Sequence, residues 1–343
     1  MEASNPRWTR RPEGSTWGDW GPDDQLGRLN LIGPAAVKRG VAEVKEGRSF
    51  CLSLPLDLPG GNLLNPRRYP PKLAPTMADE TPMYNQPVAG MAFYTGNLDL
   101  TDVVSDDAAL LYLQYSTQWD SLAHVGSLFD CYGSGEPRRV YYNGYRAEED
   151  VENPQGGAGA KALGIDKQAV KATQSRGVLV DLKRLYGPER HYVGYDDLMA
   201  AMRDQQASVE EGDILCLYTG FADWVLEQAG SPEKEVLRKG FAVLDGRDRA
   251  LQDWISESGI AALVADNYAV EGLPSREGTG RHAAMPLHEH CLFRLGLPLG
   301  ELWHLGELAA WLAAAGRNAF LLTAPPLRLP GAVGSPVTPV ATV

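Results

Sequence analysis

Short apolar runs alternate with segments of helical periodicity along most of the chain, and this alternation limits the possible folds more than any other feature. The clearest run covers residues 260–265, where six aliphatic residues end at Asp266 and Asn267. A run without polar interruption is typical of a central strand that is buried on both faces. The pattern predicts an α/β fold with a mixed sheet and flanking helices.

The other expected elements follow from periodicity and from helix-capping residues. Strands are expected at residues 50–56, 108–120, 140–142, 178–182, 214–219, 297–304 and 319–323, and helices at 34–46, 195–205, 236–244, 247–257, 286–295 and 307–315. Pro286 can begin its helix and Gly296 can end it. Neither a G-x-G-x-x-G motif nor a phosphate-binding G-x-x-x-x-G-K-S/T loop is present, so a nucleotide cofactor is not expected.

The ends and the loops predict the domain organisation. Residues 1–16 are polar and aperiodic, which predicts a flexible N-terminal arm. The length of 343 residues allows two domains or one enlarged domain, and we expect one domain over residues 17–343. Residues 57–90 are rich in proline and glycine, and a loop of this length is expected to cover a site or a partner subunit.

Composition excludes several classes of partner. The net charge is −12 and basic residues occur only as short pairs, so nucleic acid and anionic membranes are poor partners. No run approaches the roughly 18 apolar residues of a membrane span, and we expect a soluble, cytoplasmic protein. The four cysteines are far apart, which argues against a zinc knuckle and a dithiol redox motif.

Polar side chains recur on every second residue before Asp120. If the segment is a strand, Gln114, Ser116, Gln118 and Asp120 share one face and Trp119 lies on the other. A polar strand face is usually the solvent face of a sheet. If this face is buried instead, the Asp120 carboxylate needs cations or hydrogen-bond donors beside it. His124 lies close by in the sequence, and its imidazole can act as an acid, a base or a ligand.

The distribution of histidines favours a site over a solvent face. Four of the six histidines lie within 23 residues, together with Glu289 and Glu301; they are His282, His288, His290 and His304. His288 falls in the first turn of the helix expected from Pro286, and a turn at Gly296 can bring Glu301 toward it. We expect His290 to face solvent and His304 to face away from Glu301. Asp266 is equally well interpreted as a turn or helix cap.

The segment around Asp120 resembles the signature H-x-G-T-H-x-D-x-P-x-H of the cyclase family of metal-dependent hydrolases, which includes bacterial kynurenine formamidases and isatin hydrolases. Thr117, Asp120 and His124 match, whereas Gln114 and Gln118 replace histidines, Ser116 replaces glycine and Leu122 replaces proline. Further similarity to long members of the family lies at residues 17–32, 142–145, 176–181, 212–220, 288–301 and 331–336.

The resemblance implies a swivelling β/β/α cyclase-like fold and a homodimer or homotetramer. It implies a metal site made of Gln118, Asp120, His288 and Glu301. This donor set is mainly oxygen, so manganese or zinc is expected and magnesium is possible. The ion would polarise a carbonyl and activate water.

His124 is the expected general base, and His282 is a weaker catalytic candidate. We expect Gln114, Trp119, Phe129 and Tyr132 to contact the substrate, a cyclic or aromatic small molecule, because aromatic side chains suit a planar ligand.

Two functions remain open from the sequence. The first is an arylformamidase-like hydrolase that opens a cyclic or aryl amide, a formamide or a lactone. The second is a non-catalytic relative, a small-molecule-binding or structural protein that lost its metal with the two histidines. The retention of Asp120, His124, His288 and Glu301 favours the hydrolase.

Overall fold

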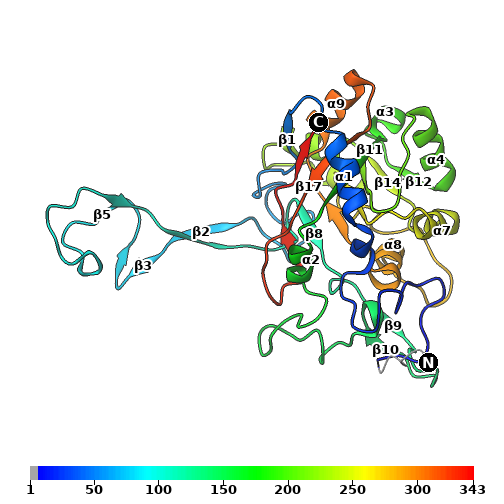
Figure 1. The fold of residues 1–343 in the computed structure, drawn as a ribbon, viewed down its shortest axis with the longest axis horizontal. Coiled ribbons are helices and arrows are strands. Elements are labelled where there is room, and N and C mark those ends of the chain that lie inside the picture. Colours follow the sequence, from blue (N-terminus) through cyan, green and yellow to red (C-terminus); the bar gives the residue numbers. More distant parts are fainter. Residues whose placement is uncertain (1–6) are drawn as a thin grey trace.

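The computed structural model describes residues 7–343, and the centre of this part of the chain is a mixed sheet of nine strands (Figure 1). In spatial order the strands are β1 (Ser49–Cys51), β19 (Val340–Thr342), β17 (Ala319–Thr323), β11 (Gln174–Asp181), β13 (Ile214–Tyr218), β15 (Ala262–Ala265), β16 (Leu299–Glu301), β8 (Gln118–Asp120) and β18 (Gly334–Pro336). The strands β11, β13, β15 and β16 are parallel, and the other neighbours pair antiparallel. The predicted α/β fold is confirmed.

Alternate side chains of the sheet enter two hydrophobic cores, one on each face. In β13, Leu215 and Leu217 belong to one core, while Ile214 and Cys216 belong to the other. Every residue of β15 is buried, as expected of a central strand. The first core is covered by α4 (Tyr195–Asp204) and α7 (Arg249–Glu257), and the second by α1 (Pro34–Ala42) and α9 (Gly306–Ala315).

Shorter elements complete the body. The helices are α2 (Ile165–Lys171), α3 (Lys183–Tyr186), α5 (Phe221–Glu227), α6 (Lys234–Lys239) and α8 (Pro286–His288), which continues as a π-helix, η4 (Glu289–Leu295). The 3₁₀ turns are η1 (Gly27–Leu31) and η3 (Tyr142–Gly144). Two small sheets pair β9 (Ser127–Phe129) with β10 (Arg138–Val140), and β12 (His191–Val193) with β14 (Ala242–Leu244). No helix among residues 7–343 is long and apolar enough to cross a membrane.

Residues 72–110, which we call the arm, project away from the body (Figure 1). At its base β2 (Lys72–Pro75) pairs with β7 (Asp107–Leu110), and further out lie β3 (Met77–Ala78), β4 (Thr81–Pro82), β5 (Gln86–Pro87), η2 (Ala92–Tyr94) and β6 (Val103–Val104). The proline- and glycine-rich segment is therefore partly a long hairpin, because residues 72–75 and 86–87 pair in register with residues 107–110 and 103–104, which follow the tip.

Several expected boundaries are wrong. The helix expected at 34–46 ends at Ala42, and the strands expected at 50–56, 140–142 and 297–304 are shifted or shortened as β1, β10 and β16. Two further differences change the kind or number of elements. The strand expected at residues 108–120 is two strands, β7 and β8, separated by a turn in which the Tyr115 amide donates to the Tyr112 carbonyl. Gln114 and Ser116 therefore lie outside the strand. The helix expected at 236–244 ends at Lys239, because the β-forming residues after Gly240 pair with β12 as β14.

Residues 7–16 run along the body. The Trp8 ring packs against Trp17 at a centroid distance of 6.0 Å, and the Thr9 amide donates to the Cys131 carbonyl. Residues 1–6 of the expected flexible arm lie outside the described residues.

A candidate metal centre

The strand pair β8 and β16 places two acidic side chains and a carboxamide at one site. In the antiparallel register Gln118 lies opposite Glu301, and Asp120 lies opposite Leu299. Because side chains two residues apart share a face, Gln118 and Asp120 point to the same side. Trp119 points to the other side, where it is fully buried against Trp303 and its Nε1 donates to a backbone carbonyl. It is thus placed in the core, away from this face.

The His288 side chain reaches the same site from the start of a helix. Pro286 begins α8, and Gly296 ends the helical segment with the positive φ of 59° that glycine tolerates. The backbone amides of Leu287 and His288 donate to the buried Glu271 carboxylate, which also lies 2.8 Å from His288 Nδ1. Glu271 therefore fixes the ring orientation and leaves Nε2 facing the strands.

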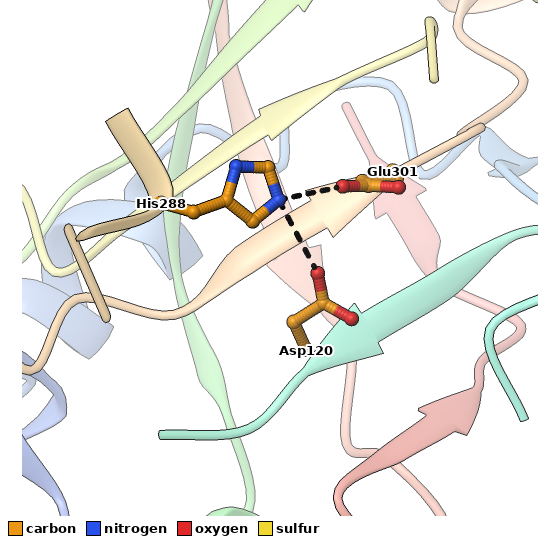
Figure 2. A group of neighbouring side chains, drawn as sticks. All are labelled: Asp120, His288 and Glu301. Atoms are coloured by element: carbon orange, nitrogen blue, oxygen red, sulfur yellow. Dashed lines mark hydrogen bonds and ion pairs between the residues drawn. The ribbon is translucent and has the colours of Figure 1, made fainter. Parts of the chain in front are cut away.

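Asp120, His288 and Glu301 form a compact buried triad (Figure 2). One ligand atom from each lies within 4.8 Å of the others. His288 Nε2 is 3.2 Å from Glu301 Oε1 and 3.9 Å from Asp120 Oδ2. One nitrogen and two carboxylate oxygens arranged this way can hold a divalent cation.

The charges of the triad favour a cation. Three buried carboxylates, Asp120, Glu271 and Glu301, surround one imidazole. Burial and the charge of Glu301 raise the pKa of Asp120 to about 8. Burial opposes protonation of His288, but hydrogen bonds to Glu271 and Glu301 raise its pKa to about 10. In the absence of a metal, protons thus supply the positive charge, and a divalent ion can replace them.

Unpartnered oxygen atoms also fit a cation. Asp120 Oδ2 and Gln118 Oε1 are buried and have no hydrogen-bond partner among the described residues. Gln118 Nε2 lies 3.1 Å from Glu301 Oε2. Buried acceptors normally have a donor or an ion beside them, so the donor set fits a hard or borderline divalent metal.

His124 lies beside the triad. Its Nε2 is 3.8 Å from Asp120 Oδ1, and its Nδ1 is 3.4 Å from Gln114 Nε2. Burial and the positive charge of His288 lower the pKa of His124 to about 4, so the ring is neutral near pH 7. The backbone of Gln114 is held in turn by Arg68, whose guanidinium donates to the Gln114 main-chain carbonyl at 2.5 Å.

Three other predicted site residues lie elsewhere. His282 is exposed and lines a separate cavity of about 820 Å³, whose lining does not include the triad. Phe129 packs edge-on against Trp17 in the first core, and Tyr132 stacks under the Arg138 guanidinium.

The remaining acidic and histidine candidates are structural. His290 is buried, contrary to expectation, because the wide turn of the π-helix directs its Nε2 to the Gln252 carbonyl at 2.8 Å. His304 Nε2 pairs with Asp223 at 3.2 Å. Asp266 caps the turn after β13 by accepting from the Thr219 amide at 2.8 Å and from the Gly220 amide, so the capping interpretation is confirmed.

The sequence did not point to Glu271 or Arg68. Glu271 lies in the loop after β15, and the signal available was a lone glutamate six residues beyond a central strand. Arg68 belongs to a basic pair at the base of the arm and contributes positive charge near Asp120, His124 and Glu301.

Comparison with known proteins gives a consistent family. The family described as "Putative cyclase" matches residues 52–272. A crystal structure of a novel cyclase is 32% identical and superimposes with a TM-score of 0.74, covering 96% of this chain and 97% of that one. No match was found among curated proteins.

More distant structures share the fold. Isatin hydrolase A from Labrenzia aggregata has a TM-score of 0.53 at 14% identity, over 86% of this chain and 93% of that one. An isatin hydrolase bound to thioisatinate has a TM-score of 0.54 at 11% identity, over 91% and 99%. The match to the family over most of the sequence, together with the close structural relative, shows that this chain belongs to the cyclase family.

Proposed function

We propose that the protein is a metal-dependent hydrolase that opens a cyclic or aryl amide, a formamide or a lactone. The observation that carries the proposal is the buried triad of Asp120, His288 and Glu301 with the neutral imidazole of His124 beside it. Burial disfavours the simultaneous ionisation of Asp120 and Glu301, and a divalent ion would stabilise the two negative charges together. The isatin hydrolases of the same fold support hydrolysis of a cyclic amide as the reaction.

The residues that would hold the ion are Asp120, His288 and Glu301, with the amide oxygen of Gln118 as a fourth, neutral donor. Manganese and zinc fit the one-nitrogen, oxygen-rich set best, and magnesium is a weaker fit because it seldom takes histidine. A divalent ion in this position supplies Lewis-acid chemistry by polarising a carbonyl oxygen and making water more acidic.

The role of His124 is proton transfer. Its ring accepts a proton from the attacking water, whose oxygen bonds to the carbonyl carbon. The C–N or C–O bond then breaks, and the ring returns the proton to the leaving nitrogen or oxygen. The products are a carboxylic acid and an amine or alcohol. Gln114, 3.4 Å from Nδ1, orients the ring.

The test is a metal-dependent assay on a defined panel. Chelator-treated protein is reloaded with manganese, zinc or magnesium and offered an N-formyl arylamine, an isatin-like lactam and an unsaturated lactone. We expect hydrolysis of at least one class, which chelation abolishes and metal restores. Protein that binds no metal and hydrolyses none of the panel would favour the non-catalytic alternative instead.

A further inference from the structure

A second cavity, separate from the one that His282 lines, lies on the body of the chain. Its volume is about 580 Å³, and its apolar lining includes Phe221, Leu237 and Leu273. No carboxylate lines it, whereas four basic side chains do: Arg67, Arg190, Arg238 and Lys239. We call this cavity the basic groove. A lining of apolar and cationic groups favours an organic ligand with an anionic end.

The arginines of the basic groove lack an anionic partner among residues 7–343. Lys239 pairs with a glutamate of its own helix at 3.0 Å. Arg190 and Arg238 instead donate to backbone carbonyls, and Arg67 donates to the side chain of Asn65. Burial lowers the pKa of Arg190, because a guanidinium that has lost part of its hydration is less stable in its charged form. The groove therefore holds positive charge that a bound anion would neutralise.

Asn267 adds a buried hydrogen-bond acceptor to the lining of the groove. The residue is 3% exposed, and its Nδ2 donates to the Ala242 carbonyl at 2.9 Å. Its Oδ1 is buried and has no partner among the described residues. Buried acceptors normally have a donor beside them. An N–H or O–H group on the body of a ligand would supply this donor.

The basic groove adjoins the candidate metal centre. The Leu302 amide, one residue beyond Glu301 of the triad, donates to the Asn267 carbonyl at 3.0 Å. Tyr268 also lines the groove, and its pKa is raised by burial and then by the charges of Glu301 and Asp120. The interaction between charges weakens with distance, so a ligand beside Tyr268 lies close to the triad.

The segment before the arm connects the groove with the proposed base. Asn65 and Arg67 line the groove, and the Asn65 side chain donates to the Tyr268 hydroxyl at 3.2 Å. Burial is the largest cause of the lowered pKa of His124, and the charges of Arg68 and Arg67 add to it. One small ligand can therefore contact both the groove and the groups that would act on it.

We propose that the basic groove binds the anionic end of the substrate and that this end carries two negative charges. The inference rests on the proposed function, because it assigns the groove to the substrate of the metal centre. One carboxylate is matched by the fork of one guanidinium, so a monoanion would leave two arginines without a partner. A phosphate monoester or a dicarboxylate supplies the missing charge, and its apolar body packs on Phe221 and Leu237.

Calorimetric titration with isophthalate and with phenyl phosphate tests the groove, and benzamide is the neutral probe. We expect both dianions to bind, with the tighter one identifying the preferred anionic group. Benzamide should bind about tenfold more weakly or less, because it makes no charge-assisted hydrogen bond. The titration is made on manganese-loaded and on chelated protein, so it decides the question even if the ion does not bind.

The double variant Arg67→Gln/Arg238→Gln assigns this binding to the groove. Both arginines are exposed, so the fold should be kept, which far-UV circular dichroism checks. The affinity for the tighter dianion should fall by about tenfold or more. The control Lys38→Gln/Arg249→Gln removes the same charge from exposed positions outside the groove and should bind as wild type does. Equal affinities in the two double variants, or no binding of either dianion to wild type, would overturn the proposal.

Matched substrates test the link to the reaction, within the class that the protein hydrolyses. For formamides, formanilide is compared with a formanilide that carries two ring carboxylates and with one that carries a ring phosphate. We expect kcat/KM of wild type to be about tenfold higher or more for a dianionic compound, through a lower KM. Equal values would overturn the inference and leave the proposed hydrolase intact. Hydrolysis of none of them, with dianions still bound in the groove, would count against the proposed function alone.

Discussion

Gln118 lies directly opposite Glu301 across the antiparallel pair β8 and β16, and its Nε2 is 3.1 Å from Glu301 Oε2. This pairing makes the carboxamide part of the site even though it replaces a histidine of the family signature. An amide oxygen is a weaker ligand for zinc than an imidazole.

We therefore expect Gln118→His to raise zinc affinity by about tenfold or more, with a smaller change for manganese, because imidazole suits zinc. Calorimetric titration of chelator-treated protein measures this. Gln114→His is the matched variant: Gln114 lies outside β8 and contacts His124, so it should change metal affinity less. A gain from Gln114→His alone would reverse this assignment.

Asp120→Asn should abolish metal binding and stabilise the metal-free protein. Between pH 4 and 8 the folded state holds a proton on Asp120 that the unfolded chain has released, because the folded pKa is raised to about 8. The stability of metal-free wild type therefore falls as pH rises through this window. The asparagine variant does not lose stability in this way. The Tm of the metal-free variant should therefore exceed that of metal-free wild type by an amount that grows toward pH 8, to roughly 2 °C or more.

Elemental analysis and thermal melts of chelated protein check both parts of this prediction. Asp107→Asn, an exposed change on β7, should leave metal content and Tm at wild-type values. A full complement of metal in Asp120→Asn would remove this residue from the ligand set.

His124→Ala should retain metal but lose about 10²- to 10⁴-fold in kcat, because it removes the proposed base and no ligand. Single-turnover rates with the best substrate of the panel, together with metal content, separate the two effects. Loss of metal alongside activity would instead make His124 a ligand.

Glu271→Gln should weaken metal binding by about 10- to 100-fold, because this carboxylate holds Nδ1 of His288 and directs Nε2 to the ion. Competition with a coloured chelator gives the affinity. The control is Glu289→Gln on the adjoining π-helix, where the carboxylate accepts from Ser127 and the metal affinity should not change. Equal effects of the two changes would argue against a specific role for Glu271.

The His304 and Asp223 pair should stabilise the protein most in mild acid. Its hydrogen bond raises the pKa of His304 in the folded state, so the contribution is complete below the unfolded pKa of about 6.5 and is lost as pH rises through the folded value. We expect His304→Gln to cost roughly 0.5–1 kcal/mol at pH 6 and less at pH 9. Urea unfolding at the two pH values measures this; a cost independent of pH would mean that the pair is uncharged.

The sequence predicted the parts of the structure that depend on local pattern. The buried run at β15, the start of α8 at Pro286 and its end at Gly296 follow from periodicity and caps, and all are present. The contact between Glu301 and His288 was also predictable, because a turn at Gly296 brings the strand that carries Glu301 back toward the helix that carries His288.

Features that depend on distant contacts were not predictable in this way. His290 is buried because the π-helix rotates it toward Gln252, and periodicity alone does not show a widened turn. Glu271 acts through a partner 17 residues away, across a loop. The arm looked like a loop because its pairing joins residues more than 30 positions apart with little hydrophobic alternation.

The strand β8 lies between β16 and β18, and Gln118 meets Glu301 only after a further 183 residues of chain. During synthesis β8 is therefore made long before either neighbour exists, and Asp120 lacks its strand partners until residues 299–301 and 334–336 have been added. A product that stops before residue 334 leaves β8 as an open sheet edge. The three residues of the proposed metal site are all present once the chain reaches Glu301, whereas both edges of β8 are paired only in a chain that extends through β18.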